Sequence, residues 1–284
     1  MRHLLFGVLV LALLAPAGTV RAALLPSQVN DLVFWVDASD IDGNGQPDGL
    51  SGGAPIGEWV DKASGNNASQ STSTLQPTLN LGAVNGLPAV TFASDYLATG
   101  SQIITGTSGR TIFAVAQAND TGSNQAILSL TSMAGGDPMP DGSFYTLSGE
   151  VAVRLKGYQL FDQDIDSPDF SVLSIANATG AVIAGIDGYL NGVQMGVADQ
   201  GLGGVTIDTR SSGESLIGVA HTGNTYFNGS IAELIVYDRE LAPGEMWQVT
   251  EYLGLKYGID VVPEPSSVML LLAATALALL WRRR

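Results

Sequence analysis

The sequence predicts an all-β fold, a two-sheet antiparallel sandwich with one short helix at its C-terminal end. The 284 residues include 35 glycines and only 14% charged residues, which is typical of a chain with many turns and few surface helices. Short runs of β-branched and aromatic residues recur between the turns, a spacing typical of antiparallel sandwiches. We predict strands over residues 32–36, 89–92, 111–116, 126–130, 144–147, 151–155, 170–175, 182–186, 216–219 and 231–237. Because the chain contains no cysteine, its hydrophobic core alone must stabilise this fold.

One tight turn is predicted at Asn191-Gly192, between the short segments 188–190 and 193–194. A two-residue hairpin turn needs positive φ angles at both central residues, and Asn followed by Gly is the pair that adopts them most readily. We therefore expect a β-hairpin here.

One helix is predicted near the end of the folded part. Pro243 suits a first helical position, Glu245 suits the first turn, and Gly258 suits the end. Ala242 precedes the helix and has no side-chain acceptor, so we expect a weakly capped start. A single apolar stripe is formed by Met246, Val249, Leu253 and Tyr257.

The N-terminus is typical of a secretory signal peptide over residues 1–22. Arg2 and His3 precede an apolar stretch at residues 4–14, and Val20-Arg21-Ala22 places small residues before a cleavage after Ala22. The body of the protein, residues 23–260, is therefore expected to be exported. Because no linker divides it, we predict one domain.

The C-terminus has three parts within residues 261–284: Pro263-Glu264-Pro265, an apolar run at residues 268–280, and Trp281 followed by Arg282, Arg283 and Arg284. This arrangement resembles the PEP-CTERM sorting signal of Gram-negative bacteria. The resemblance implies recognition by an exosortase-type membrane protease, a transmembrane segment over 268–281, an intermediate anchored in the inner membrane, and final delivery to the cell envelope or extracellular matrix.

The alternative for this tail is a plain membrane anchor. The three arginines would hold its end on the cytoplasmic side. At about 1.5 Å per residue, however, the apolar run reaches roughly 20 Å, short of the roughly 30 Å hydrocarbon core. We therefore expect the tail to be removed in the native host.

The chain carries a formal net charge of −15, and five of its 12 basic residues lie in the two terminal segments, so the body is more acidic still. Such a surface excludes nucleic acid as a partner. Divalent cations or neutral polymers that accept hydrogen bonds are better partners.

The segment 40–48 has the pattern of a calcium-binding loop. Oxygen-bearing side chains occupy loop positions 1, 3, 5 and 9, with Gly45 at the sixth position for the tight bend, as in EF-hand loops. Position 12 is Ser51 instead of a bidentate Glu, and no helix flanks the loop. The alternative is a solvated acidic surface loop. The candidate Ca²⁺ ligands are Asp40, Asp42, Asn44, Gln46 and Asp48.

A second acidic cluster contains Asp162, Asp164, Asp166 and Asp169. Its carboxylates have similar spacing, but no glycine provides the bend. We interpret it as a solvated loop.

The two ends of the body resemble the laminin G-like, concanavalin A-like jelly rolls of bacterial surface proteins. The resemblance rests on the segments 32–38 (LVFWVDA), 59–68 (WVDKASGNNA), 76–78 (QPT), 85–92 (NGLPAVTF) and 227–237 (FNGSIAELIVY), and on the closing KYGI at 256–259. Trp35 and Trp59 lie inside these motifs and are expected in the core. The resemblance implies a two-sheet jelly roll that usually binds or adheres, while a minority of enzymes share the fold. Fold alone does not settle function.

Signatures of catalysis are missing from the sequence. The body has one histidine, His221, expected to be an ordinary loop residue, and no Gly-x-Ser-x-Gly, phosphate-loop or dinucleotide motif. The Glu-x-Asp-x-(x)-Glu strand of concanavalin-like glycosidases is also missing. Glu233 lies between Ile231 and Ile235, so we predict an outward-facing residue instead of a catalytic carboxylate.

Four tyrosines are candidates for stacking on sugar rings, the alternative being that they pack on the sandwich. They are Tyr145, Tyr158, Tyr189 and Tyr226. The sequence thus predicts an exported, non-catalytic binding module with polysaccharide as its partner. The alternatives are a purely structural matrix protein bridged by Ca²⁺ and a glycan-active enzyme.

Overall fold

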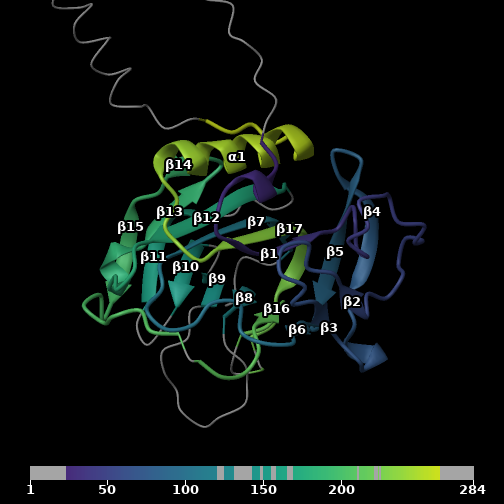
Figure 1. The fold of residues 1–284 in the computed structure, drawn as a ribbon, viewed down its shortest axis with the longest axis horizontal. Helices are drawn as coiled ribbons and strands as arrows, with labels where there is room; N and C mark the ends of the chain where they lie inside the picture. Colours follow the sequence, from purple (N-terminus) through teal and green to yellow (C-terminus); the bar gives the residue numbers. More distant parts are fainter. Residues whose placement is uncertain are drawn as a thin grey trace, which may run out of the picture.

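The computed structural model describes residues 24–119, 125–130, 143–147, 150–154, 158–164, 169–209, 211–220, 223 and 225–262. Within these ranges the chain forms two antiparallel sheets packed face to face, with one α-helix on the outer side of one sheet (Figure 1). The prediction of an all-β sandwich with one C-terminal helix is confirmed.

The first sheet has eight strands and centres on β17 (Asn228–Tyr237). One edge of β17 pairs with β7, while its other edge pairs first with β5 and then with β1. The remaining members are β1 (Leu32–Asp37), β4 (Thr78–Val84), β5 (Leu87–Ala93), β7 (Arg110–Ala118), β12 (Ser171–Asn177), β13 (Asp187–Leu190) and β14 (Val193–Gln194).

The second sheet has nine strands in the order β15-β11-β10-β9-β8-β16-β6-β3-β2. Their bounds are Val197–Gly201, Tyr158–Asp164, Glu150–Arg154, Ser143–Leu147, Gln125–Ser129, Leu216–Ile217, Leu97–Thr99, Ala68–Ser69 and Glu58–Trp59. Three short 3-10 helices lie in the connections: η1 (Pro26–Gln28), η2 (Ser73–Leu75) and η3 (Ile183–Gly185).

Two apolar clusters follow from the alternation of side chains along the strands. Phe34 and Val36 of β1 join the core between the sheets, together with Trp59 of the second sheet. Trp35, which points the other way, belongs to a second cluster with the helix α1 (Pro243–Tyr257). One face of the eight-stranded sheet therefore packs on the other sheet, and α1 covers its opposite face (Figure 1). Trp35 and Trp59 are both buried, as predicted.

The predicted hairpin and helix are both confirmed. Asn191 and Gly192 have φ angles of 51° and 83° in the turn that joins β13 to β14. The helix begins at Pro243 and ends before Gly258, whose φ is 64°. Its start is better held than Ala242 suggested, because a carboxylate oxygen of Glu245 accepts a 2.9 Å hydrogen bond from the Ala242 N–H.

Two predictions of local structure are wrong. Residues 182–186 form an isolated bridge and the 3-10 helix η3 instead of a strand. The acidic segment that begins at Asp162 is not wholly a loop, since Asp162 and Asp164 lie in β11. Asp166 lies outside the described residues, as do the signal peptide 1–22, the Pro263-Glu264-Pro265 box and the predicted span 268–281. In the described part of the chain no helix is long and apolar enough to cross a membrane.

Candidate functional site

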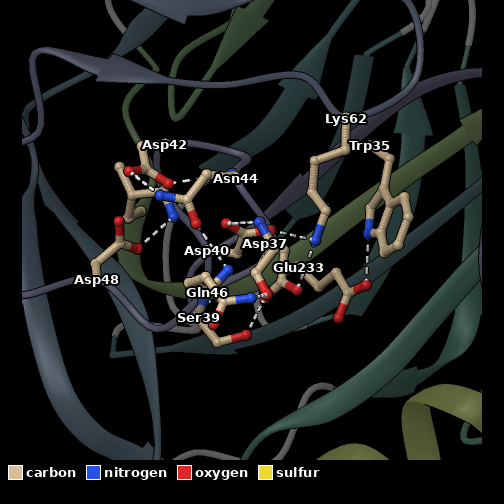
Figure 2. A network of polar contacts seen from close by, with 12 residues as sticks. Trp35, Asp37, Ser39, Asp40, Asp42, Asn44, Gln46, Asp48, Lys62 and Glu233 are labelled. Atoms are coloured by element: carbon tan, nitrogen blue, oxygen red, sulfur yellow. Dashed lines mark hydrogen bonds and ion pairs between the residues drawn. The ribbon is translucent and has the colours of Figure 1, made fainter.

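The acidic loop 40–48 follows β1 and is closed by its own hydrogen bonds (Figure 2). Asp42 accepts from the backbone and the side-chain amide of Asn44, at 3.1 and 2.7 Å. Asp48 accepts from the Ile41 N–H at 2.5 Å, and Asn44 accepts from the Gln46 N–H at 2.7 Å. These are the short side-chain-to-backbone bonds by which Asp and Asn stabilise turns.

The loop is anchored to the sandwich through Asp40. One oxygen of Asp40 accepts from the Gly45 N–H at 3.1 Å, and the other lies 2.7 Å from Lys62 Nζ. Gly45, the predicted bend residue, has a φ of 77°. Each predicted acidic ligand thus faces an N–H or ammonium donor, and within the described ranges no three His, Cys, Asp or Glu side chains are placed to hold a metal ion. Ca²⁺ binding here stays a prediction, and it requires these donors to move.

Behind the loop, a buried group of charges lies between the eight-stranded sheet and α1. We call it the charge network and define it by Asp37, Glu233 and Lys256. Asp37 and Glu233 are directly opposite each other on β1 and β17. Lys256 reaches both from the last turn of α1, with Nζ 2.7 Å from Asp37 Oδ2 and 2.8 Å from Glu233 Oε2. The side chains of the two carboxylates are 6% and 0% exposed.

Glu233 is held by donors on every side. Its Oε1 accepts hydrogen bonds from Trp35 Nε1 at 2.7 Å and from the Tyr252 hydroxyl at 3.1 Å. Its Oε2 accepts from the Tyr257 hydroxyl at 2.8 Å as well as from Lys256. Complete burial raises the pKa of Glu233, and the negative charge of Asp37 adds to that rise, against the opposing effect of Lys256.

Asp37 has a different environment at each oxygen. Its Oδ1 accepts from the N–H and the hydroxyl of Ser39, at 2.9 and 2.6 Å. Its Oδ2 faces Lys256. Lys62 Nζ lies further away, at 3.5 Å (Figure 2). Burial alone would raise the pKa of Asp37, but the charge and hydrogen bond of Lys256 and the Ser39 donors outweigh it and lower that pKa.

The prediction that Glu233 faces outward needs correction. Its side chain does point away from the core between the sheets, but α1 covers it and the residue is 1% exposed. Glu233 and Asp37 do form a pair of carboxylates across two strands. Both carboxylates are buried, with Asp37 4% and Glu233 1% exposed, so a polysaccharide has no access to them. Sequence reasoning missed the network because its partners are far apart in the chain. The sequence feature that could have indicated the network is Lys256, a cation in the last turn of a helix that has an apolar stripe.

The end of the nine-stranded sheet at β11 and β15 offers a different surface on the outer face, whereas Ala126 and Ala152 nearer the centre of that face are buried. Tyr158 and Leu160 lie on it, because the intervening Gln159 and Phe161 point inward, Phe161 into the core between the sheets. The ring of Tyr158 packs directly on Gly201, where an added Cβ would lie 2.6 Å from the ring. Its hydroxyl donates to Asp199 Oδ2 at 2.8 Å. Tyr158 is partly exposed and Asp199 is exposed.

The four tyrosine candidates do not gather at one place. Tyr189 lies on the opposite side of the molecule, paired with Ser174 on the helix-covered face of the first sheet. Tyr226 forms an isolated bridge with Val219. The side chain of Tyr145 and the whole of His221 lie outside the described parts. The contacts of Tyr158 with Gly201 and Asp199 place it on the outer face of the second sheet.

The C-terminus matches a known sorting motif. The family profile of the PEP-CTERM protein-sorting motif matches residues 261–284. The chain ends in a PEP-CTERM sorting signal. This motif indicates export and cell-surface sorting in bacteria and implies exosortase processing. No curated protein matches the chain by sequence.

One solved structure shares the fold of the body with a TM-score above 0.5, and a second is similar at a slightly lower score. The binding domain of Paraclostridial Mosquitocidal Protein 1 has a TM-score of 0.51 and 13% identity, over 78% of this chain and 52% of that one, so the match spans about half of that structure. Domain 4 of AbnA, a GH43 extracellular arabinanase from Geobacillus stearothermophilus solved with arabinotriose, has a TM-score of 0.49 and 16% identity, over 78% and 97% of the two chains. At these identities the likeness concerns the fold alone.

Proposed function

We propose that this protein is an exported, surface-sorted sandwich module that binds polysaccharide of the cell envelope or extracellular matrix and does not cleave it. The observation that carries the proposal is the position of Tyr158 on the outer face of the nine-stranded sheet. A tyrosine ring offers an apolar face for a sugar, and its fixed hydroxyl and the carboxylate of Asp199 offer polar contacts beside it.

The positions of the two chain ends support this choice of face. Both ends of the described body leave on the side of α1 (Figure 1). Pro26 O accepts a hydrogen bond from buried Tyr237, and the Val262 N–H donates to Asn191 O at 3.0 Å. Five residues separate Val262 from the apolar run that begins at Val268. At about 3.6 Å per residue they reach roughly 20 Å.

While the tail is attached, the α1 side therefore lies close to the membrane. The outer face of the nine-stranded sheet then points away from the membrane, toward the envelope or matrix. The acidic body favours a neutral or hydrogen-bonding polymer over an anionic one.

A glycan array with the purified exported protein tests the proposal. We expect a selective signal for some polysaccharides and no release of reducing ends from those that bind. The absence of any glycan signal, combined with Ca²⁺-dependent association between copies, would instead support the structural alternative. Reducing-end release that is lost when one carboxylate is changed would support the enzyme alternative.

For sorting, we propose an intermediate anchored in the inner membrane of a Gram-negative host, from which an exosortase-type protease removes the tail. The Pro263-Glu264-Pro265 box and the short apolar run support this order of events. The intact mass of the mature protein shows whether the tail has been removed. A mature protein that still contained Arg282, Arg283 and Arg284 would contradict tail removal.

A further inference from the structure

The charge network places an amine in contact with a carboxyl group at a site that α1 covers. Lys256 Nζ lies 2.7 Å from Asp37 Oδ2, so the nitrogen is in direct contact with one end of a carboxyl group whose other end is held elsewhere. The two side chains are 17% and 6% exposed. Holding two reacting groups in contact replaces a bimolecular step by a unimolecular one, and such proximity is worth effective molarities of about 10⁵ M or more.

Ser39 fixes one oxygen of Asp37. The N–H and the hydroxyl of Ser39 both donate to Oδ1, the oxygen that does not face Lys256. When a nucleophile attacks a carboxyl carbon, negative charge develops on one oxygen, and two donors fixed at that oxygen stabilise it. Lys256 contacts the other oxygen, which is the one free to leave as water.

Glu233 is placed to move the protons that this reaction requires. Its Oε2 lies 2.8 Å from Lys256 Nζ, and the residue is directly opposite Asp37 in the sheet. Trp35 and Tyr252 fix its other oxygen, so its orientation does not depend on the lysine. Its burial raises its pKa, so its carboxylate is a stronger base than an exposed glutamate and takes a proton from the neighbouring ammonium more readily.

We propose that Lys256 and Asp37 form an intramolecular isopeptide bond, with Glu233 as the proton-transfer group and Ser39 as the oxyanion donor. Glu233 takes a proton from the ammonium of Lys256 and passes it to Oδ2 of Asp37, which leaves a free amine beside a neutral carboxyl group. The amine then attacks Cγ of Asp37. The C–N bond forms as the C–Oδ2 bond breaks, and Oδ2 leaves as water with a second proton from the attacking nitrogen. Ammonium and carboxylate thus become one amide and one water, with no oxidant or further reactant.

The other nearby lysine is not the reacting one. Lys62 Nζ lies 3.5 Å from Asp37 Oδ2 but 2.7 Å from Asp40, and it sits 4.3 Å above the centre of the Trp35 ring. Lys62 is thus held toward the acidic loop, whereas Lys256 is held between Asp37 and the proton-transfer carboxyl of Glu233.

The bond would join the first strand of the first sheet to the last helix, across 219 residues. The chain has no cysteine, so a covalent closure of this kind would have the role that a disulfide has in other exported proteins. Because α1 leads directly to the sorting tail, the link would also secure the helix through which the body is held at the membrane.

Mass spectrometry of the denatured full chain tests this proposal. We expect a mass one water molecule below the sum of the residues present. Trypsin cuts after Lys62, Arg239 and Lys256 of an unmodified chain but not after an acylated lysine. The peptide that ends at Lys62 should therefore remain attached to a peptide that begins at Glu240 and continues through Lys256. Full mass, together with free peptides ending at Lys256, overturns the proposal.

Three variants separate the chemistry from a structural role. Lys256→Arg keeps the cation but cannot form the amide, and Glu233→Gln keeps the size and the acceptor oxygen but cannot transfer the proton. Both should show full mass while circular dichroism shows the native sheet content. Lys62→Arg, the matched control, should keep the loss of water. A Glu233→Gln chain that still loses one water overturns the role of Glu233, and loss of the bond in Lys62→Arg overturns the assignment to Lys256. If a variant does not fold, the mass and peptide map of the unmodified sequence still decide whether the bond exists.

Discussion

Trp35 Nε1 donates a 2.7 Å hydrogen bond to Glu233 Oε1 across 198 residues of sequence. This contact places a carboxylate on the helix-covered face of the central strand, beside a second carboxylate, Asp37, on the neighbouring strand. Two like charges directly opposite each other destabilise a sheet, and burial increases the cost. Lys256 offsets that cost, and α1 is thereby fixed to the sheet by charge as well as by apolar packing.

Replacement of Lys256 by Met should destabilise the protein strongly. It leaves Asp37 and Glu233 as two buried carboxylates with neither the cation nor the proposed amide, and leaving buried charges unpaired in this way costs at least about 3–5 kcal/mol. Urea unfolding measures the change. The control is Arg239→Met, whose partners Asp31 and Glu245 are 55% and 32% exposed, so its loss should cost about 0–1 kcal/mol. Equal effects of the two substitutions would contradict the account.

Much of the fold could be predicted because it depends on local rules. A run of apolar residues predicts the strand β17, and Asn191-Gly192 predicts the hairpin. Pro243, the apolar stripe and Gly258 predict the helix. The strand β11 was missed because its acidic end has the composition of a loop, although the side chains at its start point alternately to the two faces of the sheet.

The charge network could not be predicted for a different reason. Whether Glu233 meets solvent or protein depends on which strand pairs with β17 and on where α1 lies, and both are decided by contacts between distant parts of the chain. The position of Tyr158 over Gly201 depends likewise on the pairing of β11 with β15.

Gly192→Ala should destabilise the hairpin and displace the residue that leads into the tail. Gly192 has a φ of 83°, and an added Cβ would lie 2.5 Å from Val262 O. We expect a loss of at least about 1 kcal/mol in the free energy of unfolding. Gly204→Ala is the control, because its added Cβ would meet nothing within 4 Å. Thermal unfolding compares them, and a stable Gly192→Ala protein would show that the turn adapts freely.

Glu245→Gln should weaken the start of α1 in a pH-dependent manner. The hydrogen bond from Arg239 and the bond from the Ala242 N–H lower the pKa of Glu245 below its ordinary value of 4.5. A lowered carboxyl pKa contributes stability above the ordinary pKa, and that contribution disappears as the pH falls through the pKa of the folded state. At pH 7 the wild type should be more stable than the variant by about 0.5–1 kcal/mol. Chemical unfolding at pH 7 and at successively lower pH checks whether the difference in stability between the wild type and the variant shrinks. A difference that stays constant with pH would refute this prediction.

Millimolar Ca²⁺ should raise the melting temperature if the loop 40–48 binds the ion. Because Ser51 replaces the bidentate ligand, we expect an affinity of about 10⁻⁴ to 10⁻³ M. At about 1 mM Ca²⁺, roughly one to ten times that value, binding would stabilise the native state by roughly 0.4–1.4 kcal/mol. Asp42→Ala should lose the response without losing the Asp40–Lys62 ion pair. An unchanged melting temperature, or an equal response in Asp42→Ala, would show that the loop is held by its own hydrogen bonds alone.

The central claim is that this module binds polysaccharide through the outer face of its nine-stranded sheet. Titration calorimetry with a polysaccharide selected on the array tests it most directly, using the exported protein, Tyr158→Ala, and Tyr189→Ala as the control on the helix-covered face. Loss of one stacking ring is expected to cost about 1.4 kcal/mol, which is about a tenfold rise in Kd. We predict this weakening for Tyr158→Ala and unchanged binding for Tyr189→Ala. Equal binding by all three proteins, or weakening by Tyr189→Ala alone, would contradict the claim.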